Sequence, residues 1–164
     1  MKIKELFITK ILAIALFGIA FGYIEAAVVI YLRQLYYPGG FNIPFYPYLF
    51  YVCFPSDFIK FISLSSYFIE VCREVATISV LLSFSYLVGM NWRERLAALL
   101  FTWGVWDIFY YVFLFLIIRW PPSLLTMDVL FLIPVPWLAP VIVPIAASII
   151  MICVSIYLFI KNAY

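Results

Sequence analysis

Four long apolar stretches divide this chain, at about 7–32, 61–90, 96–118 and 139–160. Each is long enough to cross the hydrocarbon core of a bilayer as a helix, which takes roughly 20 residues. The chain is 68% hydrophobic and 11% charged, which is not the composition of a water-soluble domain. We therefore expect residues 1–164 to form a single transmembrane domain, an all-α integral membrane protein built as a bundle of four transmembrane helices.

Basic residues lie unevenly at the ends of these stretches. One end of the bundle would carry Lys2, Lys4, Lys10, Arg93, Arg95 and Lys161, and the other Arg33, Lys60 and Arg119. Because lysine and arginine are enriched in cytoplasmic loops, both termini are predicted to be cytoplasmic. The expected location is multi-pass, in a plasma or cytoplasmic membrane.

Two connections are expected on the outer side. The loop from Gln34 to Lys60 is rich in Tyr, Phe and Pro, so we expect it to lie in the membrane interface. The segment at about 123–138 contains Pro134 and Pro136, which would break a helix. It is predicted to form a short interfacial or re-entrant helix that ends near Ile133, before a new helix starts. The alternative is a surface elbow that only connects two spans. Pro144 is expected to kink the last span.

The sequence contains no histidine, which excludes several kinds of site. Histidine-ligated haem, histidine-containing zinc sites and Ser-His-Asp triads all need that side chain. A glycine-rich phosphate loop and a basic run are also absent, so neither a nucleotide nor a nucleic acid is expected as a partner. No cofactor and no catalytic residue are predicted. The expected surroundings are the lipid bilayer and either other membrane subunits or further copies of this chain.

Five charged residues lie inside the apolar stretches: Glu25, Glu70, Arg73, Glu74 and Asp107. Ionisable residues at membrane depth are costly and commonly mark ion or substrate pathways. Four acids cannot all be neutralised by one base, so the excess must be protonated or neutralised by a bound cation. The sequence predicts that Glu25, Glu70, Glu74 and Asp107 bind protons or a hard cation such as Na⁺ or Mg²⁺. The alternative is structural, a cluster that only fixes how the helices pack.

The depth of each charge can be counted along its helix. Arg73 and Asp107 both come about 18 Å below the outer end, at 1.5 Å per residue, which predicts that they form an ion pair. Glu25 and Glu70 come about 11 to 13 Å below it and would share an outer layer. Helical spacing also places one polar stripe on a single face, where it should meet protein: Ser66, Glu70, Arg73, Glu74 and Thr77.

Two further features concern packing and ligands. Gly18, Gly22 and Ala26 recur at four-residue steps, a small-residue face that allows close helix packing. Four deep aromatic residues could contact a lipid, a quinone or an organic cation: Trp103, Trp106, Tyr110 and Tyr111.

Three functions compatible with these residues can be ordered. The first is a non-enzymatic accessory subunit of a larger membrane complex, such as an energy-converting assembly, whose buried cluster holds protons or a cation or lines a proton path. The second is a small oligomeric transporter, proton-coupled or cation-specific. The third, with the least support, is a membrane-embedded enzyme that acts at the outer interface. Asp128 is expected at the outer rim, away from Asp107, so the two should not form a catalytic pair.

Overall fold

The structure, a computed structural model, describes residues 2–36, 51–52 and 63–163. It is mostly helical, and four helices are long and apolar enough to cross a membrane. They are α1 (Lys2–Tyr36), α3 (Leu64–Val88), α4 (Trp92–Ile118) and α5 (Ile142–Ala163). The four predicted spans are therefore confirmed as helices, with ends that differ by a few residues, and their length and composition suggest a multi-pass membrane protein.

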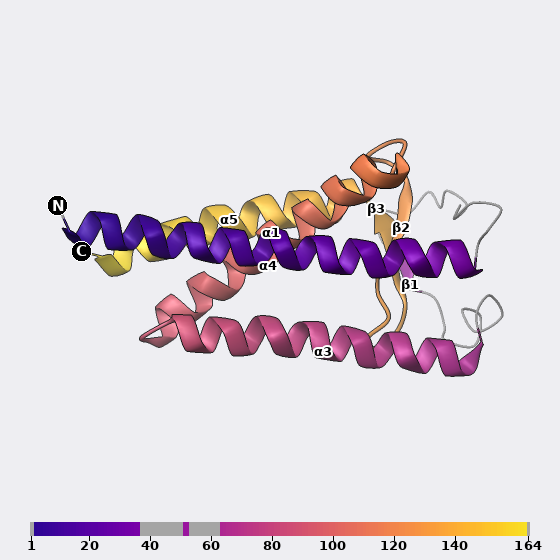
Figure 1. Ribbon diagram of the computed structural model, residues 1–164, viewed down its shortest axis with the longest axis horizontal. Helices are drawn as coiled ribbons and strands as arrows, with labels where there is room; N and C mark the ends of the chain where they lie inside the picture. The colour runs from indigo at the N-terminus through magenta and orange to yellow at the C-terminus, as the bar shows by residue number, and fades with distance from the viewer. Residues whose placement is uncertain (1, 37–50, 53–62, 164) are drawn as a thin grey trace.

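The two ends of the bundle differ. The start of α1, the turn between α3 and α4, and the end of α5 lie together at one end, and a small β-sheet lies at the other (Figure 1). The basic residues follow this division, since Lys10, Arg93 and Lys161 belong to the first end and Arg33 and Arg119 to the second. Lys60 lies outside the described residues. The cytoplasmic placement of the termini stays a prediction, now with both termini at one end.

Helix α4 is the centre of the bundle and packs against α1 and α5. Glycines allow both contacts: a Cβ added to Gly22 of α1 would lie 2.9 Å from the Trp106 carbonyl oxygen, and one added to Gly104 would lie 2.7 Å from that of Ser148 in α5. Such distances leave no room for a side chain. The predicted small-residue face of α1 is thus a packing surface, and it packs against α4.

Helix α3 packs on α4 and approaches α1 through individual side chains. At the end of the bundle that carries the sheet, the Tyr36 hydroxyl lies 2.6 Å from the Ser66 hydroxyl, and farther along the rings of Phe17 and Phe84 stack 3.8 Å apart. Between these two contacts lies the ion-pair network of Arg73. The boundary between α1 and α3 is therefore held by a few side-chain contacts, unlike the close helix packing around α4.

The segment before the last span is a β-hairpin, which corrects the prediction of a short interfacial or re-entrant helix. Strand β2 (Met127–Phe131) pairs antiparallel with β3 (Trp137–Pro140), and β3 also pairs with β1 (Tyr51–Val52), giving the order β1-β3-β2. Pro134 and Pro136 lie in the turn between β2 and β3. The fold is therefore a four-helix bundle capped by a small sheet and is not all-α.

The hairpin has a physical reason in the local sequence. Only a few residues separate Thr126 from the first of the two prolines, which is too short a run for a stable helix. Pairing the run with the segment after the prolines satisfies its backbone groups instead. Pro144 also differs from expectation: it is the third residue of α5, in the first turn, where its missing N–H has no intrahelical partner to lose. Apart from β1, the predicted aromatic loop after α1 lies largely outside the described residues.

Candidate functional site

A cavity of about 410 Å³ lies among α1, α3, α4, the first half of α5 and the β2–β3 hairpin. Most of its wall is apolar, and its polar groups come from several elements. All nine residues singled out in the sequence line it: Glu25, Glu70, Arg73, Glu74, Trp103, Trp106, Asp107, Tyr110 and Tyr111. The predicted polar stripe of α3 faces this cavity in full, since Ser66 and Thr77 line it too. A cavity of this size is typical of small-molecule sites.

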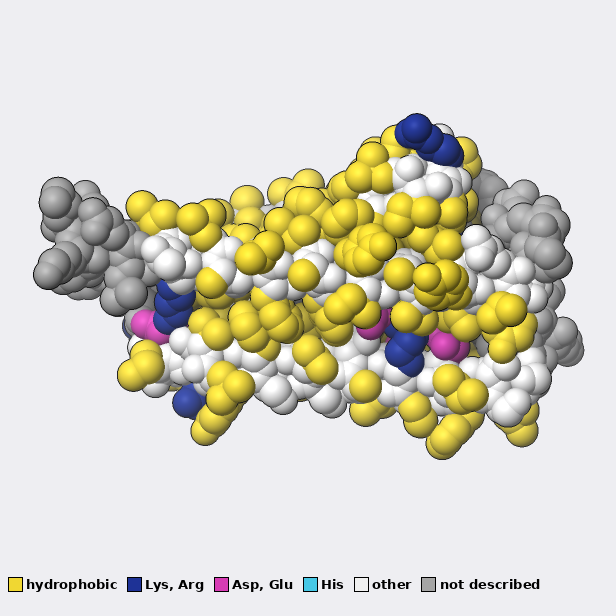
Figure 2. Space-filling model, viewed as in Figure 1, with side chains coloured by type: hydrophobic (Ala, Val, Ile, Leu, Met, Phe, Trp, Pro, Cys, Tyr) yellow, Lys and Arg dark blue, Asp and Glu magenta, His cyan; other side chains and the backbone are white. Residues whose placement is uncertain are grey.

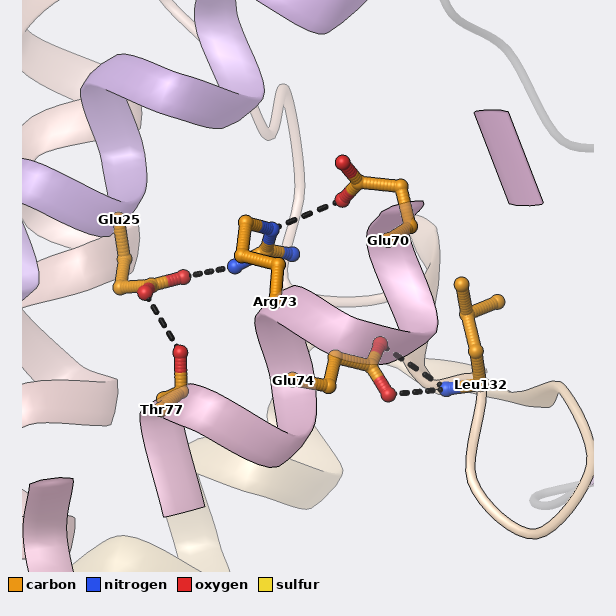
Figure 3. A network of polar contacts seen from close by, with 6 residues as sticks. All are labelled: Glu25, Glu70, Arg73, Glu74, Thr77 and Leu132. Carbon is orange, nitrogen blue, oxygen red and sulfur yellow. Dashed lines mark hydrogen bonds and ion pairs between the residues drawn. The ribbon is translucent and has the colours of Figure 1, made fainter. Parts of the chain in front are cut away.

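Arg73 on α3 joins the two glutamates that were expected to share an outer layer (Figure 3). Its Nε donates a hydrogen bond to Glu70 at 2.8 Å, and its guanidinium also forms an ion pair with Glu25 of α1. Thr77 Oγ1 donates to the other oxygen of Glu25 at 2.7 Å. Glu70 and Arg73 are three residues apart on one helix, a spacing that places them on the same face. One guanidinium thus holds two carboxylates across the α1–α3 boundary.

The predicted ion pair between Arg73 and Asp107 is wrong. Asp107 accepts a hydrogen bond from Ser148 Oγ of α5 at 2.7 Å, whereas Arg73 turns toward α1. Counting residues along a helix gives depth but neither its tilt nor its rotation, and α4 crosses the bundle obliquely (Figure 1). Asp107 therefore lies on the α5 side of the cavity, opposite the Arg73 network.

Glu74 binds the hairpin rather than another helix. Both of its carboxylate oxygens accept from the backbone N–H of Leu132, at 3.0 and 2.9 Å, at the point where β2 ends (Figure 3). Glu74 is 7% exposed and Leu132 5% exposed, so the contact is buried. A carboxylate here satisfies a backbone donor that the hairpin turn leaves without a ladder partner.

A second ion pair completes the site at the C-terminal end of α1. Arg33 Nη2 lies 3.2 Å from Asp128 Oδ1 on β2, and the Tyr111 hydroxyl of α4 donates to Asp128 Oδ2 at 3.0 Å. The guanidinium of Arg33 also stacks over the Trp120 ring, 3.7 Å from its centre. Burial raises the pKa of Asp128 above its usual range, although the Arg33 charge and the hydrogen bonds from Tyr111 and the Val129 N–H act in the opposite direction.

Arg33 and Asp128 are the site residues that sequence reasoning did not assign to the cluster. Asp128 was expected at the outer rim, apart from Asp107, but it is 2% exposed and lines the same cavity. Its neighbours along the chain, Met127 and the run from Val129, are apolar. An acid inside such a run was the signal that it is buried. The position of Arg33 in the last turn of a span gave no comparable signal, because basic residues are common at such ends.

The charges that line the cavity do not balance. Five carboxylates face two guanidinium groups: the acids are Glu25, Glu70, Glu74, Asp107 and Asp128, and the bases are Arg33 and Arg73. Ion pairs take up Glu25, Glu70 and Asp128. Among the residues that the structure describes, Glu74 and Asp107 have no lysine or arginine within ion-pair distance. These two acids have no basic partner in the cavity, and the sharing of Arg73 by Glu25 and Glu70 leaves a third negative charge uncompensated.

Aromatic rings form much of the remaining wall. Trp103 lies 6.0 Å from Trp106 and 6.1 Å from Phe131, and Tyr110 lies 4.9 Å from Tyr111, measured between ring centres. Trp106 is 7% exposed, and its indole N–H has no hydrogen-bond partner among the described residues. Buried donors are normally satisfied, so a group from outside the protein chain, such as water or a ligand oxygen, is expected there.

The acids are distributed around the cavity. Within the described part of the chain, no group of three or more Asp, Glu or Cys side chains is placed to hold a metal ion together. No protein-family model matches the chain, and searches of curated proteins and of solved structures found no significant match.

Proposed function

We propose that this protein is a non-catalytic subunit of a larger membrane assembly and that its cavity holds protons or a bound cation. One observation carries the second part: Glu74 and Asp107 line the cavity without a basic partner, while the three other acids there are paired. An isolated carboxylate in a low-dielectric interior costs several kcal/mol if it stays charged and unneutralised. A proton or a cation removes that cost.

The role as a subunit is supported by the way α3 is held. It packs on α4 and meets α1 through side chains, and its remaining surface presents large apolar residues such as Leu64, Phe68 and Ile69, each more than half exposed. A neighbouring chain can cover such a helix as well as lipid can. The groups around the cavity are carboxylates, guanidinium groups, hydroxyls and aromatic rings, which suit binding and proton transfer more than covalent catalysis.

The protonation of the cavity can be tested with a hydrophobic carbodiimide, a reagent that enters bilayers and modifies protonated carboxyl groups. The protein in lipid nanodiscs would be treated at neutral pH and the modified residues mapped by mass spectrometry. We expect modification of Glu74 and Asp107, with Glu25 as an internal control because it forms an ion pair with Arg73. Equal modification of Glu25 would contradict the proposal, and so would a lack of modification of Glu74 and Asp107 in protein that holds no bound cation.

The assembly can be tested by extraction in a mild detergent followed by size-exclusion chromatography and mass spectrometry. Co-migration with other membrane proteins in fixed ratio is the expected result. A stable assembly made of this chain alone would instead favour the second function that the sequence allows, a small oligomeric transporter.

One observation favours that second function: the cavity reaches the loosely held boundary between α1 and α3, where a helix could move. In a transporter, the protons of Glu74 and Asp107 would exchange for the substrate. Proteoliposomes with an imposed pH gradient would show uptake that Asp107→Asn abolishes. If proteoliposomes of the wild-type protein show no uptake, the transporter function is excluded.

A further inference from the structure

The size of the cavity points to a ligand larger than an ion. Ca²⁺, for example, takes six to eight oxygen ligands at about 2.3 to 2.6 Å, so the ligands of a hard cation must lie close together. The acids of this cavity are spread over α1, α3, α4 and β2, and none of the described residues form a group fit to hold a metal. The volume of about 410 Å³ lies in the range of sites for organic molecules.

The charge and the rings of the wall select the class of that ligand. Five carboxylates against two guanidinium groups repel an anionic head group and attract a cationic one. The faces of aromatic rings attract ammonium groups, and Trp103, Trp106, Tyr110 and Tyr111 lie beside the unpaired acid Asp107. The rest of the wall, including Val29, Leu32, Val143 and Met151, is suited to an apolar body.

The access route lies between α1 and α3. Acidic and basic side chains are visible from outside in the furrow between these two helices (Figure 2). The Arg73 side chain is 25% exposed there, and its partners Glu25 and Glu70 are 9% and 14% exposed. Both helices are membrane-span candidates by length and composition, and where they cross a bilayer the furrow between them opens to lipid. A ligand that enters this way must itself be soluble in lipid.

We propose that the cavity binds an amphiphile with an ammonium head group and an apolar tail, which enters from the bilayer between α1 and α3. The head group lies between Glu74 and Asp107, against the rings of α4, and the tail extends toward the furrow. This inference rests on the proposed function, because it identifies the cation that neutralises the same two acids.

The test uses a photoreactive alkyl trimethylammonium probe added to the protein in nanodiscs of zwitterionic lipid. Cross-linked residues would be mapped by mass spectrometry. Labelling should concentrate on the cavity wall, for example at Trp103 and Met151, and not on the outward face of α3. If exposed residues such as Phe68 and Leu82 were labelled as strongly as the cavity wall, the proposal would be overturned.

Competing ligands added to the wild-type protein test the charge of the head group and the route of entry without any variant. Dodecyltrimethylammonium should suppress cavity labelling about tenfold at a concentration where dodecyl sulfate and dodecyl maltoside have little effect. Equal suppression by the sulfate would overturn the assigned charge. Tetramethylammonium in the aqueous phase should compete poorly, and suppression equal to that of the amphiphile would overturn entry from the bilayer.

Variants locate the head group. Glu74→Gln and Asp107→Asn should each weaken cavity labelling about tenfold, whereas Glu94→Gln, which removes an acid paired with Lys10 outside the cavity, should leave it unchanged. Carbodiimide modification on the same preparation separates the two proposals. If Glu74 and Asp107 react but the probe does not label the cavity, only this inference fails. If neither reaction occurs in protein that holds no bound cation, both fail.

Discussion

Arg33, in the last turn of α1, forms a buried ion pair with Asp128 in β2, 95 residues later in the chain, with 3.2 Å between Nη2 and Oδ1. The pair ties the β2–β3 hairpin to the bundle, and the Tyr111 hydroxyl adds a bond from α4. Glu74 ties the other end of β2 to α3 through the Leu132 N–H. The hairpin is thus attached to three helices and forms the outer wall of the cavity.

Removing one partner of this ion pair should lower the free energy of unfolding more than removing both. Asp128→Leu leaves Arg33, which is 9% exposed, without its counter-charge, and should lower the free energy of unfolding by about 3 to 5 kcal/mol. The double variant Arg33→Met with Asp128→Leu removes both charges and should be less destabilised than Asp128→Leu alone. Denaturant unfolding in mixed micelles measures both. If the double variant lost as much free energy of unfolding as Arg33→Met and Asp128→Leu lose together, the two residues would not be coupled.

The pair also predicts a pH dependence. Burial raises the pKa of Asp128 in the folded protein above the value of about 3.9 that an unfolded chain has. Between these two pKa values the folded state binds more protons than the unfolded state, so this group's contribution to stability falls as the pH rises through that window. The difference in melting temperature between wild type and Asp128→Asn should therefore shift against the wild type as the pH rises above about 4. A shift in the opposite direction would show that the charge of Arg33 outweighs burial.

The contacts of α4 are sensitive to a single methyl group. Gly22→Ala and Gly104→Ala would bring a Cβ to 2.9 and 2.7 Å from carbonyl oxygens of neighbouring helices, and backbone cannot move aside as a flexible side chain can. Each should destabilise the protein by about 1 to 3 kcal/mol. Ala76→Val on the exposed face of α3 adds volume without such a contact and serves as the control. Melting temperatures equal to that of the control would place α1 and α5 farther from α4.

Arg73 forms ion pairs with two glutamates. In Arg73→Gln, Glu25 and Glu70 lose their cationic partner among the described residues. Glu25, which we expect to resist carbodiimide in the wild type, should then be modified. Lys10→Gln breaks the ion pair with Glu94 at the other end of the bundle and should leave Glu25 unreactive. A Glu25 that stays unreactive in Arg73→Gln is not held ionised by Arg73.

The contact between Glu74 and the hairpin can be followed by hydrogen exchange. The Leu132 amide donates to both oxygens of Glu74, so Glu74→Ala should speed its exchange, while amides in the middle of α4 keep their rates. Glu74→Gln retains an acceptor oxygen and should have a smaller effect. Equal rates in wild type and Glu74→Ala would mean that this contact does not hold the hairpin.

The sequence predicted the spans and the polar and small-residue faces of α3 and α1, because both depend on local periodicity. The stripe of α3 and the glycine face of α1 followed from helical spacing alone. The partners across helices did not, since Arg73 reaches Glu25 or Asp107 according to helix rotation and tilt, which depth does not fix. The hairpin was missed because a short apolar run bounded by prolines suits a helix end and a strand equally. The burial of Asp128 depends on that hairpin.

The central claim is that Glu74 and Asp107 are neutralised by protons or by a cation, and infrared spectroscopy of the carboxyl C=O stretch tests it directly. Wild-type protein in nanodiscs at neutral pH should show the band of protonated carboxyl groups, part of which disappears in Glu74→Gln and in Asp107→Asn. Addition of the ammonium amphiphile should reduce the same band, because it replaces the protons. A wild-type spectrum in which every acid is ionised, with no cation bound, would contradict the claim.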